Sequence, residues 1–453
     1  MIEVIEPARA EVMAELPRAG VEEVDEAVAR AKAAFPAWRA VAPGDRSRLL
    51  GALADGLEAR SGDLAVLEAR NAGKPISDAR GEIAMVVECF RYYAAAPERL
   101  LGQTIPVAGG VDMTFHEPLG VVGLIVPWNF PLVISSWKTA PALAAGNTVV
   151  LKPAELTPLT AVELERIALE AGIPEGVLNV VPGPGSVCGR RLVEHPDVAK
   201  IAFTGSTEVG RGIAAGAAGT IKRVTLELGG KSANVIFADA DIEAAAAAAP
   251  LAVFGNAGQD CCARSRILVE RDAVDDFMAA LERTVRSMVV GDPLDEATQM
   301  GPLISASHRQ TVASFLDGEV PVAFRGEAPE GPGFWFPPTV LEPTTNDVRV
   351  SREEVFGPVA AVIPFAGEAE AVELANDTIY GLSGSIWSGD GGRALRVARA
   401  LETGVVSINS NSSVRVSTPF GGFKQSGVGR ELGPDALEHY TDVKNVYYRT
   451  EEE

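Results

Sequence analysis

The sequence has few cysteines and histidines and no long apolar run. Four of its 453 residues are cysteine and four are histidine, and no pair of cysteines has the CxxC spacing. This supports neither a disulfide framework nor a zinc site, so we expect no bound metal. It contains no uncharged apolar stretch of about eighteen residues, and its N-terminus lacks the segments of a signal peptide. We therefore expect a cytoplasmic protein without a membrane partner.

Basic charge is also scarce. The chain has 40 Lys and Arg residues against 61 Asp and Glu residues, which gives a net charge of −21. Such an acidic surface repels phosphate backbones, so nucleic acid is not an expected partner. Hydrophobic residues make up 47% and charged residues 22% of the chain, which is typical of a folded α/β protein and not of a disordered one.

The hydrophobic pattern predicts two α/β units. Residues 21–70 have apolar positions at three- and four-residue steps, which indicates helices. Residues 113–126 predict a strand that is broken at residues 118–120, and after it short apolar runs alternate with helical segments. The alternation begins again after Ser232, which predicts βαβ units and a second domain with its own parallel sheet. The terminal stretch "DVKNVYYRT" alternates with period two, which predicts a strand that pairs away from the core.

Two adjacent cysteines, Cys261 and Cys262, follow a Gly-Gln step. A bridge between neighbours would close a strained eight-membered ring, so they are either core packing or include a nucleophile. A nucleophilic thiol needs a base, and none of the histidines stands in a cysteine-protease signature. Glu227, which ends an apolar strand before a Gly-Gly turn, is the candidate base. Taken alone, such a glutamate is more often a surface or capping residue.

Polar residues follow several predicted strands. Asn129 in "PWNFP" could donate its amide hydrogens to an oxyanion, or form a turn before Pro131. Lys152 ends the strand "NTVVLK" and Glu155 lies just beyond it, where ligands bind in an open parallel sheet, although a surface lysine and a capping glutamate would look the same. In a nucleotide site Glu155 would accept bonds from ribose hydroxyls and repel a 2′-phosphate, which favours NAD over NADP.

A glycine turn stands at a predicted helix start. Gly205 and Ser206 follow the strand "KIAFT", where free backbone N–H groups would favour a pyrophosphate. The spacing of Gly205 and Gly210 does not fit the GxGxxG fingerprint, and a plain turn explains the glycines equally well.

These segments occur in one fixed order. "PWNFP", "LKPAELTP", "FTGSTEVG", "LELGGKS", "GQDCCA", "EEVFGPV" and "PFGGFKQSGVGRE" cover most of the chain between Pro127 and Glu431. The sequence therefore resembles the NAD(P)-dependent aldehyde dehydrogenase superfamily. In the Gly-Gln-x-Cys pattern of that family the nucleophile stands two positions after the glutamine, which corresponds to Cys261.

The resemblance implies a role for each matching residue. Glu227 would be the general base, and Asn129 with the backbone N–H of Cys261 would hold the oxyanion. Lys152 and Glu155 would contact the adenosine ribose, Gly205 and Ser206 the pyrophosphate, and Glu354 and Phe356 the nicotinamide ribose and ring. The full set of cofactor residues implied is Pro127, Trp128, Lys152, Glu155, Gly205, Ser206, Gly229, Glu354 and Phe356.

The implied reaction is the NAD-dependent oxidation of an aldehyde to a carboxylic acid, through a thiohemiacetal and a thioester that a glutamate-activated water hydrolyses. Three alternatives remain open. A CoA-acylating semialdehyde dehydrogenase would not need Glu227, and a cysteine hydrolase would need a histidine partner. A catalytically silent member would not need to retain Cys261, Glu227 and Asn129, all of which are present.

Residues around the implied substrate site differ from a simple apolar pocket. A carboxylate at Asp260 would raise the thiol pKa if it faced the sulfur, so we expect it to point away or toward the substrate channel, where it could contact a cationic aldehyde. The loop 409–422 lacks aromatic residues that would cage a quaternary ammonium, which disfavours betaine aldehyde. The remaining candidate lining residues are Trp137, Cys262, Arg415 and Phe420, with core packing or solvation as the alternatives.

The implied fold class is α/β, with two Rossmann-like parallel-sheet domains and a small β extension. We expect residues 1–100 and 118–228 to form the NAD-binding domain and residues 229–422 the catalytic domain. Residues 101–117 and 423–453 would form an oligomerisation extension, whose strand edges need cover from another subunit. A homodimer or homotetramer follows.

Overall fold

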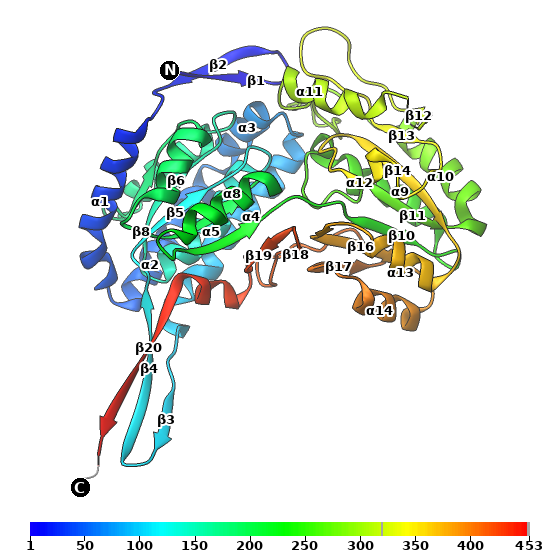
Figure 1. The fold of residues 1–453 in the computed structure, drawn as a ribbon. Helices are drawn as coiled ribbons and strands as arrows, with labels where there is room; N and C mark the ends of the chain where they lie inside the picture. Colours follow the sequence, from blue (N-terminus) through cyan, green and yellow to red (C-terminus); the bar gives the residue numbers. More distant parts are fainter. Residues whose placement is uncertain (319, 451–453) are drawn as a thin grey trace.

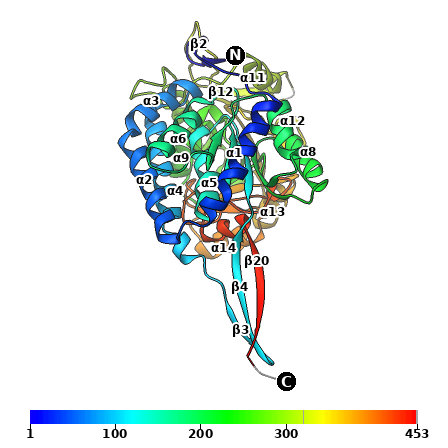
Figure 2. The same ribbon diagram turned by 90° about the vertical axis from the view of Figure 1, so that its left-hand side faces the viewer.

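The computed structural model describes residues 1–318 and 320–450. Figure 1 shows two α/β domains side by side and a narrow sheet that projects from them, and Figure 2 shows the same projection from a second side. The predicted fold class is confirmed. None of the helices in the described part of the chain combines the length and the apolar character that crossing a membrane requires.

The first domain contains a mainly parallel sheet in the strand order β19-β9-β8-β5-β6-β7, in which β19 is antiparallel to β9. Its strands are β5 (Val121–Ile125), β6 (Thr148–Lys152), β7 (Leu178–Val180), β8 (Val198–Thr204), β9 (Arg223–Glu227) and β19 (Gly427–Val428). Its helices are α1 (Val21–Arg39), α2 (Pro43–Ala59), α3 (Ser61–Ala72), α4 (Ile76–Ala94), α5 (Pro131–Ala144), α6 (Leu159–Glu170), α7 (Arg190–Glu194) and α8 (Thr207–Ala218).

The second domain has the strand order β12-β13-β14-β11-β10-β16-β17, parallel except for β12 against β13. Its strands are β10 (Ala233–Ile236), β11 (Arg266–Glu270), β12 (Val322–Arg325), β13 (Thr339–Leu341), β14 (Val359–Phe365), β16 (Ser383–Trp387) and β17 (Val405–Ile408). Its helices are α9 (Ile242–Phe254), α10 (Val274–Arg286), α11 (Ala306–Ala313), α12 (Arg349–Arg352), α13 (Glu368–Asn376) and α14 (Gly391–Ala400).

The central strands are apolar because helices cover both faces of each sheet. Every residue of β5 and of β6 is buried, as is typical of inner parallel strands. Helix α1 buries Val24, Ala27, Val28 and Ala31, which are spaced so that they share one helix face. The predicted break of the strand near residue 119 is confirmed, since β4 (Gly110–Pro118) ends at Pro118 and β5 begins at Val121.

The projecting sheet consists of β3 (Thr104–Val107), β4 (Gly110–Pro118) and β20 (Thr441–Arg449). Strand β20 pairs antiparallel with β4 from Thr441↔Pro118 to Arg449↔Gly110. The preceding residues lie elsewhere: β18 (Phe423–Lys424) pairs with β15 (Tyr380–Gly381) of the second domain, and β19 joins the sheet of the first. Within the span 423–450, the projecting sheet therefore contains only the final strand.

A short hairpin begins the chain. Strands β1 (Ile2–Glu6) and β2 (Glu11–Leu16) pair only with each other. The sequence pattern did not predict this hairpin. It lies against both domains, because Glu6 forms an ion pair with Arg70 of α3 while the Pro7 carbonyl accepts a hydrogen bond from the Phe334 N–H.

Candidate active site

The loop that carries the adjacent cysteines lies between α9 and β11 and has an unusual backbone. Asn256, Ala257 and Gly258 all have left-handed conformations, with φ of 50°, 56° and 70°. Such conformations are costly for residues with a Cβ and persist where the surroundings fix them. Here the Asn256 side-chain amide donates to the backbone carbonyl of Asn129 at 3.0 Å, which ties the loop to the first domain.

The Gly-Gly pair after β9 allows three segments to meet. A Cβ atom on Gly229 would lie 2.3 Å from Glu354 Oε2, and one on Gly230 would lie 2.3 Å from the carbonyl oxygen of Cys261. The Gly230 N–H donates to Glu354 Oε1 at 2.9 Å. Only glycine permits this approach, so the pair brings the end of β9, the cysteine loop and the loop of Glu354 together.

Two cavities meet at the cysteine. One, of about 300 Å³, has Phe130, Trp137 and Phe420 in its wall, and the other, of about 250 Å³, has Trp128 and Phe356. Three residues line both cavities: Thr204, Glu227 and Cys261. The candidate nucleophile and the candidate base therefore stand at the junction of the two cavities. We call the first the aromatic cavity and the second the glycine cavity, after Gly205 and Gly229 in its wall.

The surroundings of the Cys261 thiol raise its pKa. A side-chain hydrogen bond with Cys262, burial, and the nearby carboxyl groups of Asp260 and Glu354 all raise the pKa of Cys261. Because the thiolate is the nucleophilic form, a base must remove this proton before the sulfur can attack. Cys262 is buried and lines only the aromatic cavity of the two.

Asp260 lines the aromatic cavity, and it does not point away from the sulfur. The side-chain ligand atoms of Asp260, Cys261 and Cys262 lie within 4.8 Å of one another. Such spacing could hold a cation, but Asp260 Oδ1 already accepts the Cys262 N–H at 2.8 Å, which fixes the carboxyl in a local turn. Burial raises the pKa of Asp260, while this hydrogen bond and the positive charge of Arg264 lower it.

Asn129 lies between the end of β5 and the start of α5 and is buried. Its Nδ2 donates to the backbone carbonyl of Gln259 at 3.0 Å, and its own carbonyl accepts from Lys74 Nζ at 2.9 Å. A side-chain amide has two N–H hydrogens, so one is left for a ligand in the glycine cavity, which Asn129 lines. The turn before Pro131 and a donor role are thus compatible.

Glu227 ends β9 and is buried, and neither of its carboxyl oxygens has a hydrogen-bond partner among the described residues. Burial and the neighbouring carboxyl of Glu431 raise the pKa of Glu227 well above its usual value, while Lys138 and Arg430 lower it. Lys138 and Glu431 form a buried ion pair. An unsatisfied buried carboxyl at a cavity wall is a group that a substrate or a water can reach.

The predicted cofactor residues fall into two groups. Seven of them line the glycine cavity: Pro127, Trp128, Gly205, Ser206, Gly229, Glu354 and Phe356. Burial raises the pKa of Glu354 to about 7. The ring of Phe356 meets that of Trp128 edge to face, with centroids 5.3 Å apart, and Phe356 has a left-handed backbone. Ser206 caps α8, where its hydroxyl accepts the N–H of Val209.

Lys152 and Glu155 line neither cavity and lie at and beyond the end of β6. Burial lowers the pKa of Lys152 to about 8. Arg18 Nη2 lies 3.5 Å from Glu155 Oε1. The positive charge of Arg18 offsets part of the negative charge with which Glu155 would repel a 2′-phosphate, and the local sequence gave no sign of this pair.

Four of the five predicted substrate residues line the aromatic cavity, and one does not. Trp137 and Phe420 are buried, with ring centroids 5.2 Å apart, and both line the aromatic cavity, as do Asp260 and Cys262. Arg415 is exposed and is not part of the cavity wall. The wall also includes residues the sequence analysis did not single out, among them Glu82, Met85, Val133, Ile134, Arg264, Asn411, Ser413, Val414 and Glu431.

Some residues in or near the site that the sequence did not single out still have a distinguishing sequence feature. Glu431 ends the quoted motif "PFGGFKQSGVGRE", and Lys138 is a lone charge in an apolar helix. His308, from α11, contacts the carbonyl of Phe356 through Nε2 at 2.7 Å, and its ring packs on Trp128. Nothing in the local sequence of His308 distinguishes it, because the contact joins segments far apart in the chain.

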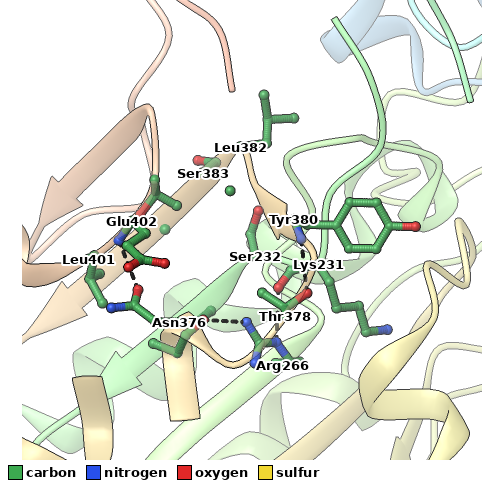
Figure 3. A pocket seen from close by; sticks show the side chains of 15 residues that line it. Lys231, Ser232, Arg266, Asn376, Thr378, Tyr380, Leu382, Ser383, Leu401 and Glu402 are labelled. Atoms are coloured by element: carbon green, nitrogen blue, oxygen red, sulfur yellow. Dashed lines mark hydrogen bonds between the residues drawn. The ribbon is translucent and has the colours of Figure 1, made fainter. Parts of the chain in front are cut away.

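A smaller cavity of about 10 Å³ lies beside Lys231 (Figure 3). Arg266 donates to the Ala375 carbonyl at 2.8 Å, and Asn376 accepts the Glu402 N–H at 2.8 Å, so the surrounding segments are joined. Burial lowers the pKa of Lys231 to about 7. The volume is near that of one water molecule, so this cavity is too small for a substrate.

Together the fold and the site define a two-domain α/β protein. Polar residues at the carboxyl ends of the strands of the first domain lie beside the Cys261 loop of the second domain. A model of the aldehyde dehydrogenase family matches residues 1–446. The chain belongs to the aldehyde dehydrogenase family, and the resemblance seen in its sequence is confirmed.

Known proteins resemble the chain over nearly its whole length. An aldehyde dehydrogenase of Emericella nidulans is 43% identical over 454 residues, covering 99% of this chain and 91% of the relative. The crystal structure of PnpE from Pseudomonas sp. WBC-3 in complex with nicotinamide adenine dinucleotide is 44% identical, with a TM-score of 0.97, and covers 100% of this chain and 95% of that one. The NAD⁺ complex of an aldehyde dehydrogenase from Bacillus cereus is 42% identical, with a TM-score of 0.97 and coverages of 99% and 93%.

Proposed function

We propose that the protein oxidises an aldehyde to a carboxylic acid with NAD as the hydride acceptor. The observation that carries the proposal is the position of Cys261 and Glu227 at the junction of the two cavities. One cavity would hold the aldehyde and the other the nicotinamide end of the cofactor. Family membership and two related structures with bound nicotinamide adenine dinucleotide support this assignment.

The residues of the glycine cavity fit a nicotinamide ribose. A Cβ atom on Gly229 would collide with Oε2 of Glu354. Because residue 229 is glycine, the Glu354 carboxyl has room to reach a ribose hydroxyl. The rings of Trp128 and Phe356 line the same cavity. The start of α8 behind Gly205 and Ser206 would take the pyrophosphate, because its backbone N–H groups favour negative charge. When bound, the nicotinamide would accept the hydride that the aldehyde carbon loses.

The protein's own groups would perform the other steps. Cys261 loses its proton to a base, and the sulfur bonds to the aldehyde carbon to form a thiohemiacetal. The free N–H of Asn129 and the backbone N–H of Cys261 hold the negative oxygen of that adduct. Loss of hydride leaves a thioester on Cys261. Glu227 then takes a proton from a water, which attacks the thioester and releases the acid and the thiol.

NAD is proposed over NADP because Glu155 lies beyond β6 at the predicted adenosine end. Its carboxylate would accept hydrogen bonds from ribose hydroxyls and repel a phosphate, although Arg18 offsets part of this charge. The preference is therefore expected to be moderate.

We also propose that the projecting sheet forms a subunit interface and that the protein is a homodimer or homotetramer. Apolar and aromatic side chains are exposed on this sheet: Ile105, Val107, Phe115, Val443, Val446, Tyr447 and Tyr448. Strands β3 and β20 are the two edges of this sheet. Both features favour cover by a second copy.

One assay tests the activity. Purified protein is mixed with NAD and a set of aliphatic, aromatic, amino and carboxy aldehydes, with and without CoA, and reduced cofactor is followed by its absorbance. Turnover without CoA is expected. A strict requirement for CoA would indicate acyl transfer to CoA, and a lack of turnover with every aldehyde would indicate a silent family member.

A further inference from the structure

Arg264 is a buried cation in the wall of the aromatic cavity. It is 4% exposed. Its Nη1 donates to the Cys262 carbonyl at 2.9 Å and its Nη2 to Ser413 Oγ at 2.8 Å. Both acceptors are neutral oxygens, and its Nε has no hydrogen-bond partner among the described residues. Burying a guanidinium without a direct anionic partner is unfavourable, so an anionic ligand would stabilise this arrangement.

A second unpartnered donor lines the same cavity. The indole Nε1 of Trp137 is buried without a hydrogen-bond partner in the described part of the chain, and an indole nitrogen can only donate. The Arg264 Nε likewise can only donate. These two buried donors could bind the acceptor oxygens of a ligand. The same wall also holds unpartnered acceptor oxygens, on Glu227, Asn411 and Glu431, so the donors form only one part of the cavity. The remaining lining is largely apolar, including Val133, Ile134 and Val414.

Two of the four carboxyl groups that line the cavity are paired with lysines. Glu82 is paired with Lys74 at 2.5 Å, and Glu431 is paired with Lys138. Burial raises the pKa of Glu82 to about 7, and burial also raises the pKa values of Asp260 and Glu227, whereas the positive charge of Arg264 lowers that of Asp260. An arginine keeps its charge inside proteins.

We propose that Arg264 determines substrate specificity by binding a carboxylate carried by the aldehyde, so that the substrates are ω-carboxy aldehydes with an apolar or aromatic spacer. The spacer would lie against Phe130, Trp137 and Phe420, and the aldehyde carbon would reach Cys261. The inference rests on the proposed aldehyde oxidation, because it places the aldehyde in the aromatic cavity. It assigns to Arg264 the role first considered for Arg415, which lies outside the cavity.

Matched aldehydes test the proposal in the full-length enzyme. The ratio of kcat/KM is measured for 4-formylbenzoate against 4-methylbenzaldehyde, and for 6-oxohexanoate against hexanal. The wild type is expected to favour the carboxylate of at least one pair by about tenfold or more, as expected where a site hydrogen-bonds its substrate. In Arg264→Met the ratio should fall to about one or below, while Arg264→Lys, which keeps the charge without the planar fork, should lie between. The matched control is the exposed Arg415→Gln, which should keep the wild-type ratio.

Two results would overturn the proposal. One is a wild-type enzyme that prefers the neutral member of both pairs, or a cationic 4-(aminomethyl)benzaldehyde, which would point to Asp260 instead. The other is an Arg264→Met protein that melts at a temperature similar to that of the wild type and keeps the carboxylate preference.

A binding measurement separates this inference from the proposed activity. Terephthalate, a dicarboxylate that cannot be oxidised as an aldehyde, is titrated while Trp137 fluorescence is followed, with Trp137→Phe to identify the signal. Saturable quenching gives a dissociation constant for terephthalate. An increase of at least tenfold in this constant in Arg264→Met would support the carboxylate site even if no aldehyde were turned over. Binding that is unaffected by the substitution would contradict it. If Arg264→Met fails to fold, Arg264→Lys, which should also weaken terephthalate binding, serves in its place.

Discussion

Glu227 and Glu431 line the same cavity, and the single lysine of α5 that pairs with Glu431, Lys138, also acts on Glu227. The carboxyl that would activate water is therefore not an isolated base. Its charge depends on a second buried carboxyl, which raises its pKa, and on a buried ammonium, which lowers it.

This arrangement predicts opposite pH shifts. Glu227 must be ionised to take a proton from water, so its raised pKa should place the acid limb of the kcat profile well above the usual range of a glutamate. Glu431→Gln removes a negative neighbour, lowers the pKa of Glu227 and should move that limb to lower pH. Lys138→Met removes a positive neighbour and should move it to higher pH. The measurement is kcat against pH, with melting temperatures as a control because a broken buried pair destabilises the fold. Shifts in the same direction would contradict the prediction.

The two cysteines should differ sharply. Cys261→Ala should abolish turnover, because the covalent adduct cannot form. Cys262→Ala should retain activity within about tenfold and should lower the pKa of Cys261, since a hydrogen bond with Cys262 helps to raise it. The rate at which iodoacetamide alkylates Cys261 is measured by mass spectrometry over a range of pH. In Cys262→Ala the rise of this rate with pH should occur at lower pH than in the wild type. Loss of activity only in the Cys262 variant would place the nucleophile one residue later.

Replacing the base should separate acylation from hydrolysis. Glu227→Gln should slow turnover by about 10²- to 10⁴-fold, the usual contribution of a general base. If another group can deprotonate the thiol, one equivalent of reduced cofactor should form quickly and the acyl group should remain on Cys261. Rapid quenching and intact-protein mass spectrometry would detect this acyl-enzyme. Full multiple-turnover activity in Glu227→Gln would rule out its role as the base.

The cofactor preference should depend on one carboxylate. Glu155→Gln removes the charge that would repel a 2′-phosphate and leaves Arg18 free to attract one, so kcat/KM with NADP should rise relative to that with NAD by about tenfold or more. Arg18→Gln should shift the ratio the other way. Initial rates with each cofactor at saturating aldehyde give the ratio. If both variants leave it unchanged, the adenosine end lies elsewhere.

The projecting sheet should decide the oligomeric state. Val446→Lys and Tyr448→Glu together place charges on a surface that is expected to be apolar in the assembly, so they should shift the protein toward a smaller species. Light scattering coupled to size exclusion measures the mass, and Val209→Lys, an exposed apolar residue of α8, is the matched control. A wild-type protein that is monomeric at micromolar concentration would refute the proposed interface.

The sequence predicted much of the fold because periodicity is a local property. The alternation of apolar strands with amphipathic helices indicated two parallel-sheet domains, and the final period-two segment proved to be β20. The N-terminal hairpin was missed, since β1 and β2 are short and partly exposed and their stability depends on contacts with distant residues such as Arg70.

The sequence by itself marked Glu227 and Asn129 as candidates, because each stands at a strand end or turn, and the resemblance of its motifs to the family selected Cys261 over Cys262. Only the tertiary structure decided how these residues act on one another. It buried Arg264 and left Arg415 exposed, placed Asp260 close to the sulfur, and gave Glu227 its two charged neighbours. Burial and pairing of charges depend on residues far apart in the chain, so no local pattern contains them.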